Sequence, residues 1–474
     1  MGAHAFDSEI MKLIRKAARA EHVSLVVGAG ASVPSDLPTW ENFARGLLKH
    51  GSRPTPSDDA IAAVIDSQGV RLASEAAMND KTDKDRRDLI ARALYGKRAR
   101  RDYVPTGLHR AVADLAIARG PENLTLITLN YDELLERALE LRGATVRARS
   151  SAGYSGTSGA HVVHHLHGLL GTSRYSNEFV VTESDYFWSR DPSSDWRSGV
   201  VSEAAAKGPM VFVGTSLVDP NLLHYRCVLR ERRGAGQRIA VLPRQGTELG
   251  SANHDDARAL LRSQWNALGV APAFVEDYAD VTTFVSELVT QRETGRKSPA
   301  QRVRALWRAV EEGFETSKQD WSDALAATYR ADLRSVLGSE GNLVLWVADG
   351  RGSLVRVAGN DRVHRDVRSL RRIPYRFDAG WVATDVVSYS DDDVVIRDLG
   401  EADHAPEAVP SRRWRTVAGI SLTAAVDGFP TMVGALTAAT TKPDDGGLTL
   451  KVDKWRNAMV AAANEWSSRL SDLV

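Results

Sequence analysis

Four short stretches place glycine, amide or imidazole groups directly after an apolar run of the chain. These stretches are GAGAS at 28–32, NYD at 130–132, HLHG at 165–168 and GTS at 214–216. Glycines let the backbone N–H groups of a turn approach a phosphate closely, because no side chain is in the way. An asparagine can hold a water or a hydroxyl without titrating, and a histidine can accept a proton at neutral pH. Together these residue types would suit a site that binds a phosphorylated ligand and acts on it.

The first stretch is an incomplete dinucleotide fingerprint. Residues 23–27, VSLVV, predict a buried strand that runs into Gly28 and Gly30. We expect these glycines to allow close backbone approach and a positive φ. The fingerprint requires a third glycine, and Val33 stands there instead. A tight strand-to-helix turn with no ligand is therefore an open alternative for this stretch.

The elements that position these stretches alternate between strands and helices. Helical periodicity covers 6–17 and most of 40–119. Short apolar or alternating runs predict strands at 23–27, 124–128, 146–149, 162–166, 210–213, 239–242 and 273–275. This alternation predicts an α/β fold with a Rossmann-like, doubly wound parallel sheet. Ligands of such sheets bind outside the carboxyl ends of the strands, so we expect the four stretches to form one site.

The sequence pattern changes after a polar segment, RETGRKSPAQ, at 292–301. One amphipathic helix follows, and then short alternating strands with Asp349-Gly350 and Asp427-Gly428 at hairpin-turn positions. A second helix closes the chain. We therefore predict a first domain at 1–292, a linker at 293–300 and a separate α+β domain at 301–474.

The composition argues against several classes of protein. Lys and Arg number 61 and Asp and Glu number 61, so the formal net charge is zero and attracts neither nucleic acid nor an anionic membrane. The basic run at 97–101 is interpreted as a solvated helix end, with nucleic-acid contact as the less favoured alternative. No apolar run approaches the roughly 20 residues that span a bilayer, and the first residues lack a secretion signal, so we expect a cytoplasmic protein. The single cysteine, Cys227, excludes an intrachain disulfide and a four-cysteine zinc site.

The four stretches, together with PTW at 38–40, resemble the sirtuin fold over about residues 8–290. More closely, they resemble the bacterial sirtuin-like branch that hydrolyses NAD in anti-phage defence, in a form of abortive infection. Sirtuin deacetylases also carry a zinc module with two CxxC pairs, which one cysteine cannot build. They tend to have Asp-Phe-Arg where Thr39-Trp40-Glu41 stands here. The resemblance therefore favours cleavage of the nicotinamide–ribose bond over peptide deacylation.

The resemblance assigns roles to particular residues. It implies that Asn130 and His167 are the catalytic pair, that Asp132 lies near the nicotinamide ribose, and that the glycine turn binds the pyrophosphate. NAD+ is then the substrate, and no metal is expected. The residues implied in NAD binding are Gly28, Ala29, Gly30, Ser32, Asp132, Gly214, Thr215 and Ser216.

Each catalytic assignment has a structural alternative. Asn130 could cap the helix that begins near Asp132, and capping does not exclude catalysis. His167 could be a core histidine with satisfied hydrogen bonds. His164, His165 and His167 could suggest a metal, but strand alternation would direct His164 to the opposite face.

The second domain resembles, more weakly, a GAF sensor domain. Such a domain would bind a small nucleotide signal or mediate assembly into a homo-oligomer, and a scaffold with no ligand is the alternative. We therefore expect an NAD+ hydrolase that yields nicotinamide and ADP-ribose and is activated by a signal or by assembly. Two alternatives stay open: a non-catalytic sensor that binds NAD or ADP-ribose, and an NAD-dependent protein deacylase.

Overall fold

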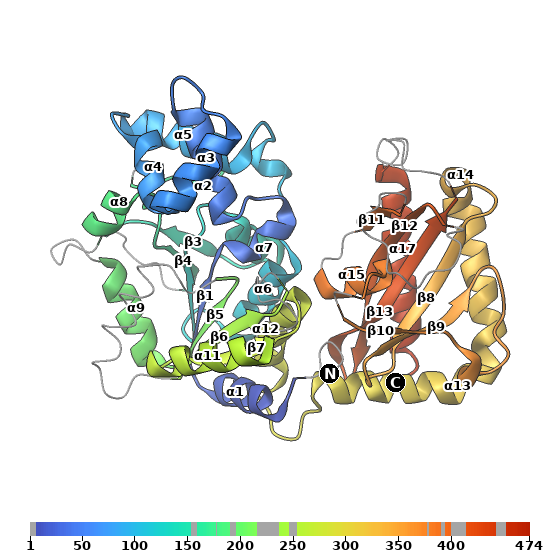
Figure 1. Ribbon diagram of the computed structural model, residues 1–474. Helices are drawn as coiled ribbons and strands as arrows, with labels where there is room; N and C mark the ends of the chain where they lie inside the picture. The colour runs from blue at the N-terminus through green and yellow to red at the C-terminus, as the bar shows by residue number, and fades with distance from the viewer. Residues whose placement is uncertain are drawn as a thin grey trace.

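The computed structural model contains two β-sheets, each with its own set of helices (Figure 1). It describes residues 6–152, 159–176, 178–189, 196–215, 237–245, 254–376, 379–389, 394–399, 414–441 and 452–474. None of the helices in these ranges is long and apolar enough to cross a lipid bilayer.

The first sheet is parallel and has seven strands in the order β3-β4-β2-β1-β5-β6-β7. The strands are β1 (Val23–Val27), β2 (Leu124–Thr128), β3 (Val146–Arg149), β4 (His161–His165), β5 (Met210–Val213), β6 (Arg238–Pro243) and β7 (Ala271–Val275). β1 lies at the centre, between β2 and β5, and all five of its residues are buried, which explains its unbroken apolar sequence. The predicted Rossmann-like sheet is therefore confirmed, with β4 one residue earlier than expected.

Helices cover both faces of this sheet. One face carries α1 (Ser8–Arg19), α6 (Gly107–Arg119), α7 (Leu134–Leu141) and α12 (Tyr278–Thr290), and the other carries α9 (Trp196–Lys207) and α11 (His254–Ala267). Asp7 caps α1, because its Oδ1 accepts a hydrogen bond of 2.8 Å from the Ile10 N–H. The doubly wound arrangement leaves the carboxyl ends of β1, β2, β4 and β5 at one edge.

A group of helices lies beyond that edge (Figure 1). It consists of α2 (Trp40–Gly51), α3 (Asp58–Gln68), α4 (Val70–Met78), α5 (Asp83–Tyr95) and α8 (Glu183–Trp188), with 3-10 turns at Ala29–Ala31, Val33–Ser35 and Arg100–Asp102. Tyr131, directly after β2, joins this group to the sheet. Its ring packs 5.5 Å from that of Phe43, and its hydroxyl donates to the Val180 carbonyl at 2.6 Å. The residue between Asn130 and Asp132 is thus an anchor for the helices above the site.

The second sheet is antiparallel, with six strands in the order β10-β9-β8-β13-β12-β11. The strands are β8 (Asn342–Ala348), β9 (Ser353–Gly359), β10 (Arg372–Pro374), β11 (Val395–Asp398), β12 (Thr416–Val426) and β13 (Phe429–Thr440). Both predicted hairpins are present, and Asp427 and Gly428 have φ of 54° and 79°, as a two-residue hairpin turn requires. The α+β character is confirmed, while the GAF-like identity stays a prediction.

Helices cover both faces of the second sheet. α13 (Pro299–Thr328) and α17 (Val452–Ser471) pack on one face, and α15 (Val382–Tyr389), which the sequence analysis did not predict, packs on the other. A π-helical turn (Tyr329–Leu333) and α14 (Arg334–Leu337) continue α13, and a 3-10 turn lies at Val367–Ser369. Pro299 already opens α13, inside the predicted linker, and the domain boundaries themselves stay a prediction.

A buried ion pair joins α12 of the first sheet to α13 of the second. Glu287 and Arg302 are 0% and 2% exposed, and their side chains are in hydrogen-bond contact. Arg302 also donates to the Thr431 hydroxyl and to the Lys297 carbonyl, at 2.8 and 2.9 Å, and Gln291 donates to Glu287 at 2.8 Å. Each charge therefore has several partners, which offset the cost of removing it from water.

We expect Arg302→Met to destabilise the protein by about 3–5 kcal/mol, because the Glu287 carboxylate would stay buried without its counter-charge. The double variant Glu287→Leu/Arg302→Met should lose less free energy of unfolding, since it leaves no charge unpaired. Urea denaturation followed by tryptophan fluorescence measures both. The control is Arg469→Met, which removes an exposed pair with Glu465 and should cost about 1 kcal/mol or less. Equal losses for Arg302→Met and Arg469→Met would contradict the expectation.

Candidate functional site

The glycine turn after β1 packs directly against the end of β5. A Cβ added at Gly28 would lie 2.6 Å from the Gly214 carbonyl oxygen and 2.7 Å from Thr215 Cβ, and one at Gly30 would lie 3.0 Å from the same oxygen. The glycines therefore allow a close backbone approach to the end of β5, while the expected approach to a phosphate stays a prediction. The expected positive φ is wrong for Gly28 and Gly30, because the turn is a 3-10 helix with ordinary dihedral angles; the positive φ, 63°, belongs to Gly214.

Backbone hydrogen bonds hold this turn in place. The Gly28 and Gly30 N–H groups donate to the Val213 and Gly214 carbonyls at 3.0 and 2.8 Å, and the Ser32 N–H donates to the Ala29 carbonyl at 2.9 Å. Ala29 itself is exposed. Ser216, assigned to the same ligand, and Cys227 lie outside the described residues. Contact between these groups and NAD stays a prediction.

Ser32 links the ends of β1 and β2 through its side chain. Its hydroxyl donates to Asp132 Oδ2 at 2.9 Å and accepts from Asn130 Nδ2 at 3.0 Å. All three side chains are buried. Because the single Ser32 proton is directed to Asp132, the Asn130 amide nitrogen must face the serine. Asn130 Oδ1 then points elsewhere, and it is a buried acceptor with no hydrogen-bond partner among the described residues.

Asp132 has two roles within the protein. Its Oδ1 accepts from the N–H of Leu134, the first residue of α7, at 3.0 Å, as in an Asx turn. The N-cap residue of α7 is Glu133, so the cap that the sequence left open for Asn130 is not formed by Asn130, and Asp132 only adds a side-chain hydrogen bond at the helix start. Burial raises the pKa of the Asp132 carboxyl, although the hydrogen bonds from Leu134 and Ser32 oppose that rise.

His167 lies at the same edge of the sheet as Asn130. Thr128 pairs with His165 in the β2–β4 ladder, and Asn130 and His167 each follow two residues later. The His167 ring is buried, and it meets the Tyr186 ring edge-on with the ring centres 5.3 Å apart. Its catalytic role stays a prediction. Among the described residues, no group of three or more His, Cys, Asp or Glu side chains is placed to hold a metal.

The sequence analysis missed two site residues at the start of α6. His109 Nε2 lies 3.5 Å from the Ser32 hydroxyl, and its Nδ1 lies 2.8 Å from Thr106 Oγ1. Thr106 in turn donates to the Ala31 carbonyl at 2.9 Å. The Thr-x-x-His spacing is a helix-start signal, and both side chains do form a capping box, but nothing local places them beside Ser32.

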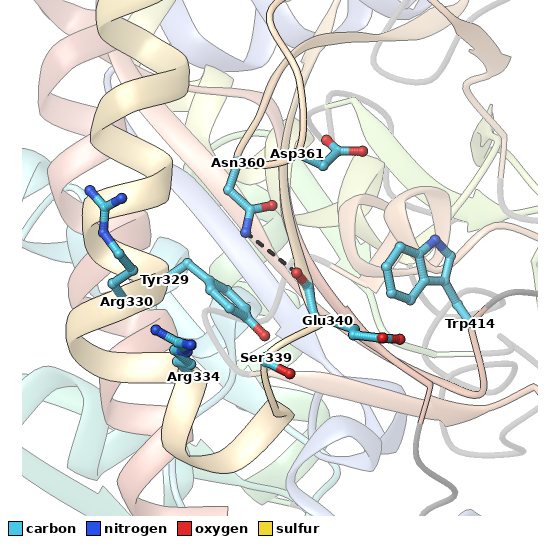
Figure 2. A pocket seen from close by; sticks show the side chains of 9 residues that line it. Tyr329, Arg330, Arg334, Ser339, Glu340, Asn360, Asp361 and Trp414 are labelled. Atoms are coloured by element: carbon cyan, nitrogen blue, oxygen red, sulfur yellow. Dashed lines mark hydrogen bonds between the residues drawn. The ribbon is translucent and has the colours of Figure 1, made fainter.

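The second sheet has a polar pocket of about 300 Å³ beside the π-helical turn. Side chains of both charges line it, namely Arg330, Arg334, Glu340 and Asp361. Figure 2 shows the Tyr329 ring between the arginines and Glu340, and Trp414 on the far side. This pocket is a candidate place for a small polar ligand.

We expect His109→Gln to flatten the pH dependence of stability on the acid side. Burial lowers the pKa of His109 to about 3, against 6.5 when the ring is exposed. Between these two pKa values, His109 is neutral in the folded state and protonated in the unfolded state. The contribution of neutral His109 is complete above about pH 6.5 and is lost as the pH falls towards 3, by up to about 1.4 kcal/mol per pH unit.

Urea denaturation across this pH range measures the slope for wild type and variant. The control is His50→Gln, which removes an exposed ring whose pKa partial burial also lowers, and it should change the slope less than His109→Gln does. A His109→Gln slope equal to the wild-type slope would show that the ring does take up a proton in the folded state.

Comparisons with known proteins find a similarity over part of the chain that carries this site. The model of the SIR2-like domain matches residues 124–272, which include Asn130, Asp132 and His167. No curated protein matches the chain. The crystal structure of a Sir2 homologue–NAD complex is 19% identical, covers 61% of this chain and 94% of its own, and has a TM-score of 0.32. The structure of a Sir2 homologue mutant in complex with ADP-ribose is 18% identical, covers 59% of this chain and 95% of its own, and has a TM-score of 0.33. The chain is thus similar, over residues 124–272, to the SIR2-like domain.

Proposed function

We propose that the first sheet and its helices bind NAD+ and hydrolyse the nicotinamide–ribose bond, which yields nicotinamide and ADP-ribose. One observation carries this proposal. Ser32, Asn130 and Asp132 converge at the carboxyl edge of the sheet and leave Asn130 Oδ1 as a buried acceptor with no partner among the described residues. The SIR2-like match over residues 124–272 supports the same ligand class.

The proposed reaction breaks the bond between the ribose carbon and the nicotinamide nitrogen. The electron pair of that bond leaves with nicotinamide, positive charge develops on the ribose, and a water oxygen bonds to the ribose carbon. Asn130 Oδ1 accepts a hydrogen bond from the water or from a ribose hydroxyl without titrating. His167 takes the proton that the water loses. The buried carboxyl group of Asp132, when ionised, would stabilise the developing charge.

The proposed hydrolase is an effector that a signal or assembly activates. The candidate side chains are shielded from water: Ser32, His109, Asn130 and His167 are all at most 7% exposed. Unregulated loss of NAD would be toxic to a cell, so a site that stays shielded until a trigger acts would suit the function. Homo-oligomer formation and a role in anti-phage defence belong to this proposal and rest on the resemblance. A cytoplasmic location also belongs to it and rests on the sequence expectation.

The second sheet is connected to the site through packed and hydrogen-bonded elements. It contacts α12 through the Glu287–Arg302 pair, α12 packs on α6, and α6 carries His109 beside Ser32. A small nucleotide signal in the polar pocket would act along this series of packed elements. This observation favours a sensor role for the second part, with a GAF-like domain as the proposed identity.

We expect His167→Ala to lower NAD+ turnover by about 10²–10⁴-fold, because the general base is removed. Asn130→Ala should also abolish most turnover, since the buried acceptor is lost. Chromatography of nicotinamide and ADP-ribose measures both, with and without candidate nucleotides. Asn42→Ala, an exposed asparagine on α2, is the matched control and should retain turnover.

Three results would separate the alternatives. Unchanged turnover in both variants would overturn the assigned mechanism. Tight NAD or ADP-ribose binding without product, under every condition, would favour the non-catalytic sensor. Release of O-acetyl-ADP-ribose from an acyl-lysine peptide would favour the deacylase.

If a nucleotide activates turnover through the polar pocket, Arg330→Glu/Arg334→Glu should abolish activation, because two positive charges that attract a phosphate become negative. The same assay measures activation across a panel of cyclic and linear nucleotides. The control is Arg351→Glu/Arg368→Glu, which reverses two exposed charges of the same region. Activation that persists in the pocket variant would place the signal elsewhere.

A further inference from the structure

A second buried ion pair lies directly behind the candidate site. His165, the last residue of β4, and Glu136, on α7, are both 0% exposed, and Nε2 of the imidazole lies 2.6 Å from Glu136 Oε1. The other ring nitrogen, Nδ1, lies 3.1 Å from the backbone carbonyl oxygen of Asn130. One histidine thus joins a helix, a strand end and the peptide group of the proposed catalytic asparagine.

The protons of this pair follow from its contacts. A carbonyl oxygen can only accept a hydrogen bond, so His165 Nδ1 must carry a proton. The Glu136 carboxylate shares a second proton with Nε2. Burial acts to lower the pKa of His165, but the negative charge of Glu136 and the hydrogen bonds at both nitrogens outweigh it and raise that pKa. The contacts and the direction of this shift both favour an imidazolium paired with a carboxylate.

Glu136 needs this partner. Its second oxygen, Oε2, is buried with no hydrogen-bond partner among the described residues. A buried carboxylate with no counter-charge is costly, because no water reaches it. Separation of Glu136 from His165 would therefore be unfavourable. His165 is therefore fixed in position, and so is the carbonyl to which it donates.

Asn130 is held at three points. The imidazolium fixes its carbonyl, Thr128 Oγ1 accepts from its N–H at 3.0 Å, and Ser32 accepts from its side-chain amide at 3.0 Å. Of these three contacts only the one to His165 involves a charge, and charge-assisted hydrogen bonds are roughly twice as strong as neutral ones. The direction of Asn130 Oδ1 depends on all three.

We infer that His165 and Glu136 are positioning residues, which hold the Asn130 peptide so that its side-chain oxygen faces the reacting ribose. The inference rests on the proposed NAD+ hydrolysis for its catalytic consequence. Neither residue touches substrate; each acts through Asn130. Misplacement of a catalytic group by about 1 Å can lower a rate by about 10²-fold. We therefore expect a large loss of rate when His165 is substituted, although it does not take part in the reaction itself.

The test compares kcat and KM for wild type, His165→Leu and the double variant His165→Gln/Glu136→Gln. His165→Leu should lower kcat per folded molecule by about 10²-fold and leave KM close to that of wild type, because binding energy comes from other contacts. The double variant replaces the ion pair by two neutral amides. These amides can still hydrogen-bond to each other and to the Asn130 carbonyl. This variant should recover most of the lost kcat.

A control separates positioning from stability. Ile14→Ala removes a fully buried side chain of α1, away from the strand ends, and should lower the melting temperature while kcat per folded molecule stays at the wild-type value. If His165→Leu behaves like Ile14→Ala, with a lower melting temperature and unchanged kcat, the pair is only structural and the inference is overturned.

A second readout does not depend on turnover. The ¹H–¹⁵N signals of the Asn130 side-chain amide, assigned by their loss in Asn130→Ala, should shift or broaden in His165→Leu and return in the double variant. Signals that stay unmoved in His165→Leu would overturn the inference even if kcat falls. If wild type shows no turnover under any condition, the proposed hydrolysis fails, and these signals still decide whether the pair positions Asn130.

Discussion

The close contact between the glycine turn after β1 and the end of β5 determines where the rest of the site can lie. Gly28 and Gly30 leave no room for a side chain, because the Gly214 carbonyl oxygen occupies the space that a Cβ would need. The Gly30 N–H donates to that same oxygen. With the turn fixed in this way, Ser32 is carried over the end of β2, where its hydroxyl meets Asn130 and Asp132. A backbone contact on one side of β1 therefore sets the side-chain network on the other.

Burial gives this network its chemical character. Polar groups that are removed from water must find partners within the protein, and most of those around the site do so. Glu136 is balanced by His165, and Asp132 accepts two hydrogen bonds while burial raises its pKa. Asn130 Oδ1 is the exception, since it has no partner among the described residues. A buried acceptor of this kind is costly for folding, and such a cost is typical of positions that serve a ligand.

Packed helices and a buried ion pair connect the two sheets, in addition to the chain that runs from one to the other. α12 packs on α6 through apolar side chains and meets α13 through the Glu287–Arg302 pair. α6 begins with Thr106 and His109, which contact the glycine turn and Ser32. A change in the second sheet thus has a continuous set of packed and hydrogen-bonded elements through which to reach the site. This arrangement gives the proposed regulation a physical basis.

The sequence by itself determined the elements whose cause is local. Apolar runs of the right length became the buried strands, Asp427-Gly428 formed the tight hairpin turn, and one cysteine ruled out a four-cysteine zinc site. The order of the stretches after β1, β2, β4 and β5 also indicated a shared edge, because carboxyl ends of parallel strands meet there.

Only the tertiary structure decided which side chains meet. Ser32 and His109 are 77 residues apart, and Asn130 and His165 are 35 apart. Periodicity reports the face of an element and not its partner across the fold, so the roles of His109, His165 and Glu136 became visible only once the strands and helices were packed.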